Sequence, residues 1–153
     1  AGLFTGAYHF FSYDSPGESQ AELFIRTVPA SEGALPPVVD VEFYGDYEQH
    51  PADAERVREQ LHRMLSLLEE HYGKPPVLYA TGRSYRLYLT EGFEAFPIWI
   101  RDVLWEPSLS DGREWLFWQY TGHGRLRGFE GDESSIDLNV FAGSEEELAA
   151  LTD

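Results

Sequence analysis

The chain has 153 residues, and its 27 acidic side chains against 11 lysines and arginines give a formal net charge of −16. Nucleic acids and anionic membranes bind proteins through a basic footprint, so we expect neither as a partner. The length suits one domain over residues 1–153, and a chain without cysteine forms no disulfide and performs no thiol chemistry.

The first part of the chain predicts two strands with a helix between them. Residues 6–11 are apolar and aromatic and are followed by a cluster of turn residues, which is typical of a strand. Ser15 as the cap and Pro16 at the first helical position predict a helix that ends before Pro29. The apolar run that follows predicts a second strand over residues 38–42.

The middle of the chain continues this alternation. Apolar side chains recur at helical spacing over residues 57–72, and Gly73 ends that helix. A strand over residues 77–80 and a short helix over residues 84–89 follow. Repeated strand-helix units indicate parallel strands joined by right-handed crossovers.

From residue 97 onwards the pattern changes to strands separated by loops. Strands are predicted over residues 98–100, 115–120 and 136–140, and Ser144 with Glu147 forms a capping box for a short last helix. The order fits a TIM-like β/α barrel that has lost its later helices, but it contains about six strands where a closed parallel barrel has eight. The chain is therefore a fragment or a shortened variant, or its sheet stays open, or a partner, which can be a second copy of the chain, completes the barrel.

Two acidic side chains, Asp40 and Glu42, end the strand predicted over residues 38–42. Strand side chains alternate between faces with a rise of ~3.3 Å per residue, so both acids point to one face with their stems ~6.6 Å apart. Carboxylate pairs at this spacing cleave glycosidic bonds. The C-terminal end of a parallel strand is also where α/β barrels keep their active sites. We therefore predict a catalytic pair with a carbohydrate site around it.

Seven segments carry a further pattern, namely residues 6–10, Gln20-Ala21 with Phe24, and residues 37–42, 79–81, 97–100, 118–128 and 136–141. In this order they resemble the segments of the glycoside hydrolase family 25 lysozymes, the N-acetylmuramidases of bacteria and their phages. The resemblance implies a modified β/α barrel of five strand-helix units followed by three nearly bare strands. The family pattern begins with a strand that carries a further active-site Asp, so this chain corresponds to an N-terminally short domain.

The resemblance also implies a function and a role for each acid. The family cleaves the β-1,4 bond between N-acetylmuramic acid and N-acetylglucosamine in peptidoglycan, by a retaining, substrate-assisted reaction. Glu42 is then the general acid/base, and Asp40 assists the acetamido group of the substrate. An inactive glycan-binding derivative of the same fold is the alternative. Where the family usually has a small residue and then an aromatic one, this chain has Arg101, Asp102 and Val103.

Further residues are candidates for holding the sugar. The predicted substrate-binding residues are Asp137, Tyr8, Tyr79, Trp99 and Tyr120. Aromatic rings in late strands can stack on sugar rings, but core packing is the competing role for each of them. Tyr8 and His9 are adjacent, so one faces the barrel interior and the other the helix layer, where a core histidine would lie.

The sequence gives no sign of a metal or another cofactor. Its 5 histidines are scattered without a paired spacing, and the two acids alone are a poor ligand set. We expect peptidoglycan glycan strands as the partner. The family implies a secreted or cell-wall location, although no signal peptide is recognisable in the chain.

Overall fold

The computed structural model describes residues 3–128 and 135–153. Its strands are β1 (Tyr8–Phe10), β2 (Val38–Val41), β3 (Val77–Thr81), β4 (Ile98–Arg101), β5 (Phe117–Gly124) and β6 (Ile136–Phe141). Its α-helices are α1 (Gly17–Thr27), α2 (Ala54–Tyr72), α3 (Gly82–Ser84) and α4 (Glu145–Ala150). A 3-10 turn, η1 (Gly45–Glu48), follows β2, and a π-helical turn, η2 (Tyr85–Leu89), follows α3.

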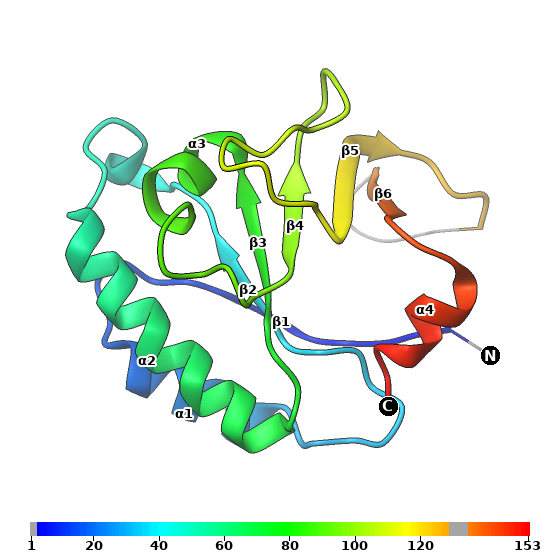
Figure 1. Ribbon diagram of the computed structural model, residues 1–153, viewed down its shortest axis with the longest axis horizontal. Helices are drawn as coiled ribbons and strands as arrows, with labels where there is room; N and C mark the ends of the chain where they lie inside the picture. The colour runs from blue at the N-terminus through cyan, green and yellow to red at the C-terminus, as the bar shows by residue number, and fades with distance from the viewer. Residues whose placement is uncertain (1–2, 129–134) are drawn as a thin grey trace.

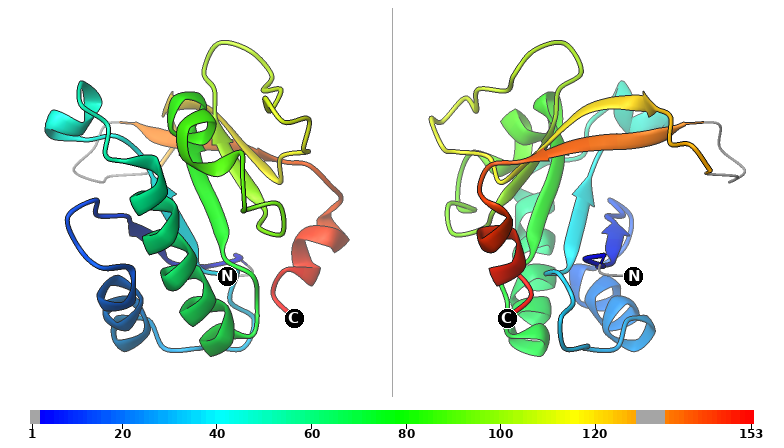
Figure 2. Two further views of the ribbon diagram at one scale, coloured as in Figure 1. Left: turned by 60° about the vertical axis from the view of Figure 1, so that its left-hand side comes forward. Right: turned by 90° about the vertical axis from the view of Figure 1, so that its right-hand side faces the viewer.

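The described strands form one curled sheet in the order β1-β2-β3-β4-β5-β6 (Figure 1). β1 to β5 are parallel, as the alternation of strands and helices predicts, whereas β6 runs antiparallel to β5. Figure 2 shows β5 and β6 as a long ribbon that extends past the rest of the sheet. The strand number and the mixed α/β architecture confirm the prediction of an incomplete TIM-like barrel.

Helices α1 and α2 lie beside each other over one face of the sheet (Figures 1 and 2). The Asp53 carboxylate caps α2 by accepting a hydrogen bond of 2.9 Å from the backbone N–H of Arg56. The helix ends at Gly73, whose φ of 69° is left-handed and costs glycine little. Between these ends, the buried stripe of α2 consists of Val57, Leu61, Met64, Leu65 and Leu68.

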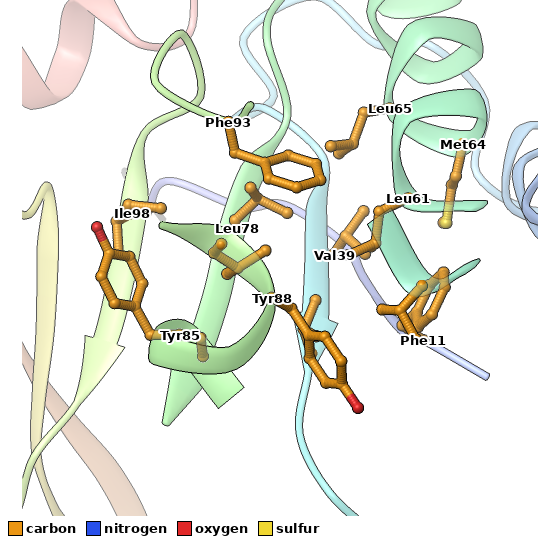
Figure 3. Close-up of a cluster of buried hydrophobic side chains, with 14 of the residues drawn as sticks. Phe11, Val39, Leu61, Met64, Leu65, Leu78, Tyr85, Tyr88, Phe93 and Ile98 are labelled. Carbon is orange, nitrogen blue, oxygen red and sulfur yellow. The ribbon is translucent and has the colours of Figure 1, made fainter. Parts of the chain in front are cut away.

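The main core lies between these helices and the sheet (Figure 3). Val39, Leu78 and Ile98 point from neighbouring strands toward the helix layer and are almost completely buried. Because strand side chains alternate, the residues between them point to the opposite side, which we call the inner face. The inner face carries Tyr8, Phe10, Val38, Asp40, Tyr79, Trp99, Arg101 and Gln119.

Several element boundaries differ from the predicted ones. α1 begins at Gly17, and Pro16 occupies the cap position without a side-chain cap bond, so the assignment of Ser15 as the cap is wrong. β5 starts later than predicted and continues to Gly124, because its partner β6 supplies hydrogen bonds along that length. Among the described residues, no helix is long and apolar enough to cross a membrane.

Candidate functional site

The strand register brings the predicted residues of the inner face into rows. Asp40 is level with Tyr79, which is level with Trp99 on β4. Two residues further along β3 and β4, and on the same face, Thr81 is level with Arg101. These rows lie at the C-terminal ends of the parallel strands, where the chain leaves the sheet for its loops.

Glu42 is the first residue after β2, which ends one residue earlier than the sequence predicts. It lies two positions beyond Asp40, so both acids belong to the inner face. Beside Glu42 is a hollow of about 380 Å³. Its lining residues are Glu42, Phe43, Glu48, Gln49, Thr81, Arg83 and Arg101.

Asp40 is the more enclosed of the two acids. Its side chain is 9% exposed, and its Oδ1 atom has no hydrogen-bond partner among the described residues. Burial, reinforced by the nearby charge of Glu42, raises the pKa of the Asp40 carboxyl to about 7. An orphaned carboxylate oxygen is costly to bury, so this atom is suited to accept a hydrogen bond from a ligand.

Glu42 is half-buried, and burial raises the pKa of its carboxyl above the ordinary value. Asp137 adds to this rise by charge repulsion, whereas the guanidinium of Arg101 opposes it. The carboxyl therefore retains its proton to a higher pH than a solvated glutamate does. A pair of such acids in one site can donate a proton and stabilise a positive charge.

The backbone at Glu42 is held by tyrosines from the β1-α1 loop and the segment after β2. The Tyr13 hydroxyl donates to the Glu42 carbonyl oxygen at 3.0 Å, and the backbone N–H of Tyr13 donates to the Tyr44 hydroxyl at 3.1 Å. The Tyr13 and Tyr44 rings are stacked with their centroids 5.5 Å apart. This anchor fixes the direction in which the chain leaves β2, and sequence reasoning missed it.

Tyr79 and Trp99 form an aromatic wall next to the acids. Their rings meet edge to face with centroids 5.5 Å apart. The Tyr79 hydroxyl donates to the Gln119 side-chain oxygen, and the Trp99 indole N–H donates to Asn139 Oδ1 at 2.9 Å. These bonds connect β3, β4, β5 and β6 across the inner face. The role of Asn139 was not predicted, although its parity with Asp137 was a usable signal.

Asp137 is the second residue of β6. Because β6 is antiparallel, its first residues lie at the same edge of the sheet as the last residues of β1 to β4. The Asp137 carboxylate lies close to Gly122, where a Cβ atom would be only 3.2 Å from Oδ1. Its negative charge reaches both Glu42 and Tyr79.

Tyr8 and Tyr120 lie apart from this group. Tyr8 is 70% exposed on β1, because its neighbour His9 faces the helix layer and hydrogen-bonds to Gln20 at 2.9 Å. The Tyr120 ring packs on Trp118, with centroids 5.9 Å apart. Gln119 between them points to the inner face, so Tyr120 belongs to the opposite side of β5, and the structure does not bring it to the other predicted residues.

A second hollow, of about 260 Å³, lies at the far end of the sheet between α1 and the segment before β2. Phe24, Tyr72 and Lys74 contribute to its lining, and the predicted site residues do not. Within residues 3–128 and 135–153, no group of three or more His, Cys, Asp or Glu side chains is arranged to hold a metal ion.

Residues 1–129 match the sequence pattern of Glycosyl hydrolases family 25. YegX, an uncharacterized protein of Escherichia coli O157:H7, is 38% identical over 152 residues, which make up 99% of this chain and 53% of YegX. Lysozyme M1 of Streptomyces globisporus is 30% identical over 176 residues, with 99% of this chain and 54% of that lysozyme covered. The chain thus spans about half the length of these curated relatives.

Two solved structures are also similar to this chain. A family 25 glycosyl hydrolase from Bacillus anthracis matches with a TM-score of 0.92 and 53% sequence identity, covering 98% of this chain and 69% of that one. The bacterial lysozyme from Streptomyces coelicolor matches with a TM-score of 0.84 and 27% identity, covering 99% of this chain and 73% of that one.

Proposed function

Because this chain belongs to glycosyl hydrolase family 25, we propose that it hydrolyses peptidoglycan as a retaining muramidase. The bond cleaved is the β-1,4 linkage between N-acetylmuramic acid and N-acetylglucosamine. Lysozymes among its relatives support the substrate class. The observation on which the proposal rests is the buried, unpartnered Oδ1 of Asp40 on the same face as Glu42.

Glu42 is the proton donor in this proposal. Burial and the charge of Asp137 raise the pKa of its carboxyl, which lets it carry a proton near the pH at which it must act. Glu42 transfers this proton to the glycosidic oxygen as the bond to the anomeric carbon breaks. The resulting carboxylate then accepts a proton from the water that completes hydrolysis.

Asp40 assists the acetamido group of the substrate. Its unpartnered Oδ1 accepts a hydrogen bond from the acetamido N–H, which turns the acetamido oxygen toward the anomeric carbon. Attack by that oxygen forms a cyclic cation, and the Asp40 carboxylate stabilises its charge. A donor at Oδ1 also favours the ionised form of Asp40, and the negative charge of that form favours the protonated form of the nearby Glu42 carboxyl.

The aromatic wall supplies the binding surface. Tyr79 and Trp99 offer apolar ring surface beside the acids, and their polar atoms are already bonded to Gln119 and Asn139. Sugar rings stack well on such preordered aromatics. Asp137 contributes a hydrogen-bond acceptor at the same edge, and Tyr8 extends the surface toward β1.

Clearing of a peptidoglycan suspension, followed as loss of turbidity, tests the proposal. Glu42→Gln removes the proton donor while keeping the shape of the side chain, so the rate should fall by about 10²- to 10⁴-fold. Glu55→Gln, at the exposed start of α2, is the charge-matched control and should clear at the wild-type rate. Equal clearing by Glu42→Gln would remove Glu42 from the mechanism.

The inactive glycan-binding derivative gives a different result in the same assay. The wild-type chain would then be retained on insoluble peptidoglycan in a pull-down but would leave the turbidity unchanged. The family membership favours the enzyme, and the raised pKa values of Asp40 and Glu42 on the inner face support it.

We also propose that the chain acts at the bacterial cell wall, where its substrate lies, and that it can self-associate through β1. β1 is an edge strand of the described sheet, and Tyr8 and Phe10 on its inner face are 70% and 43% exposed. Edge strands with exposed apolar side chains favour pairing with another chain. Gel filtration at twice the monomer mass would support association, and elution at the monomer mass would exclude it.

A further inference from the structure

The hollow beside Glu42 is lined partly by cations. Arg83 and Arg101 both contribute to it, although the whole chain has only 11 lysines and arginines and a formal net charge of −16. Both side chains are exposed. The same lining includes Glu42 and Glu48, so the hollow places two guanidinium groups beside two carboxyl groups.

The two arginines differ in how their guanidinium groups are used. Arg83 donates from Nη1 to the Glu48 carbonyl oxygen at 2.5 Å, and its guanidinium lies 4.5 Å from the centre of the Phe43 ring. These contacts account for Arg83 as a structural tie between α3 and η1. The Arg101 guanidinium makes no hydrogen bond or ion pair with the other described residues, so its donors are available to a ligand.

The register fixes where Arg101 lies relative to Glu42. Val41 is level with Ala80, so Glu42 follows at the level of Thr81, and Thr81 is level with Arg101. Adjacent strands are ~4.8 Å apart, which puts the stems of Glu42 and Arg101 roughly 10 Å apart on one face. A group held by Arg101 would therefore belong to a sugar that flanks the bond on which Glu42 acts.

We propose that Arg101 is a specificity-determining residue that binds a carboxylate of the substrate, namely the free lactyl carboxylate of a muramic acid unit next to the scissile bond. This inference rests on the proposed function. Muramic acid differs from N-acetylglucosamine by a lactyl ether that ends in a carboxyl group. A planar guanidinium with unused donors binds carboxylates in a two-pronged geometry that a neutral sugar cannot match.

Arg101 also lowers the pKa of Glu42, and this second effect must be separated from recognition. An arginine that acted only through Glu42 would change the handling of acidic and neutral sugars equally. An arginine that binds the lactyl carboxylate changes the ratio between them. The ratio is therefore the quantity to measure.

The test compares two ligands that differ at a single group, which is negatively charged in one and neutral in the other. One is the disaccharide of N-acetylglucosamine and N-acetylmuramic acid with a free lactyl carboxylate, and the other is the same disaccharide with that carboxylate converted to the amide. Dissociation constants are measured by NMR titration for the wild-type chain, Arg101→Gln, Arg101→Lys and the control Arg26→Gln. Arg26 lies exposed in the last turn of α1, far from the inner face.

The wild-type chain and Arg26→Gln should bind the acid at least about tenfold more tightly than the amide, as expected for one charge-assisted hydrogen-bonded pair. Arg101→Gln should bring the ratio close to one, and Arg101→Lys should give an intermediate value because it keeps the charge without the planar fork. An unchanged ratio in Arg101→Gln overturns the inference, as does a wild-type chain that does not distinguish the two ligands. Turbidity clearing is measured separately, so a chain that selects the acid but clears nothing would contradict the proposed function alone.

Discussion

Asp40 is enclosed by the fold although an aspartate in water is ionised at neutral pH. Burial raises the pKa of its carboxyl from 3.8 to about 7, so the folded chain keeps a proton that the unfolded chain releases. The free energy of unfolding therefore decreases as the pH rises from about 4 to about 7, and it levels off above that. This rise in the pKa corresponds to roughly 4 kcal/mol of free energy of unfolding, which is lost at alkaline pH.

Replacing Asp40 by asparagine should remove most of this pH dependence. The amide side chain does not titrate, so Asp40→Asn should be more stable than the wild-type chain at pH 8 and should lose far less stability between pH 4.5 and pH 8. Urea unfolding at both pH values measures the difference. Asp46→Asn, at an exposed position in η1, is the control, and its free energy of unfolding should depend on pH as that of the wild-type chain does. If Asp40→Asn showed the same pH dependence as the wild-type chain, burial of Asp40 would not be its cause.

At the scale of elements, local patterns predict which segments form strands and helices but not how they pair. The capping residue Asp53 and the terminal Gly73 delimit α2 by contacts within the helix itself, and such signals are present in the sequence. The antiparallel direction of β6 and the length of β5 depend on pairing across residues far apart in the chain. The π-helical turn of η2 likewise has no local signature that separates it from an α-helix.

The crossing of α1 and α2 depends on Gly17. A Cβ atom at this position would lie 1.9 Å from the Gln60 carbonyl oxygen, and the backbone N–H of Gly17 donates to the Gln60 side-chain oxygen at 2.9 Å. Gly17→Ala would force the helices apart and should lower the free energy of unfolding by about 1–3 kcal/mol or more. Chemical denaturation measures this effect.

Glu22→Ala provides the comparison, because Glu22 lies on the exposed side of the same helix and should change stability by less than about 0.5 kcal/mol. If the two variants unfolded at the same denaturant concentration, the close approach at Gly17 would not limit the packing of the helices.

At the scale of the molecule, parity along the strands predicts most of the candidate site. Asp40, Glu42, Tyr79 and Trp99 share the inner face because they occupy alternate positions in neighbouring parallel strands. Tyr120 does not join them, since one step along β5 reverses the face. The anchor from Tyr13 to Glu42 joins residues 29 positions apart, and no local pattern encodes such a contact.

The net charge of −16 gives a prediction for the proposed action of the whole chain on an acidic glycan. Repulsion between the two should slow their encounter at low ionic strength, where the screening length is ~30 Å at 0.01 M, and should fade at 0.15 M, where it is ~8 Å. The rate of clearing should therefore rise with salt over this range. Clearing of the same peptidoglycan with its carboxylates amidated is the control and should not depend on salt in this way. A clearing rate on the acidic glycan that fell with salt would mean that local cations outweigh the overall charge.

Each central strand contributes alternate side chains to the core and to the inner face, so the two sets of side chains depend on the same register. In β3, Leu78 and Ala80 support the core, while Tyr79 between them faces the acids. Deleting or inserting a single residue inside this strand would exchange the two sets and turn Tyr79 into the helix layer. Variants of this protein can therefore diverge by substitution or by changes in loop length, but a change in the length of a central strand would destroy core and site together.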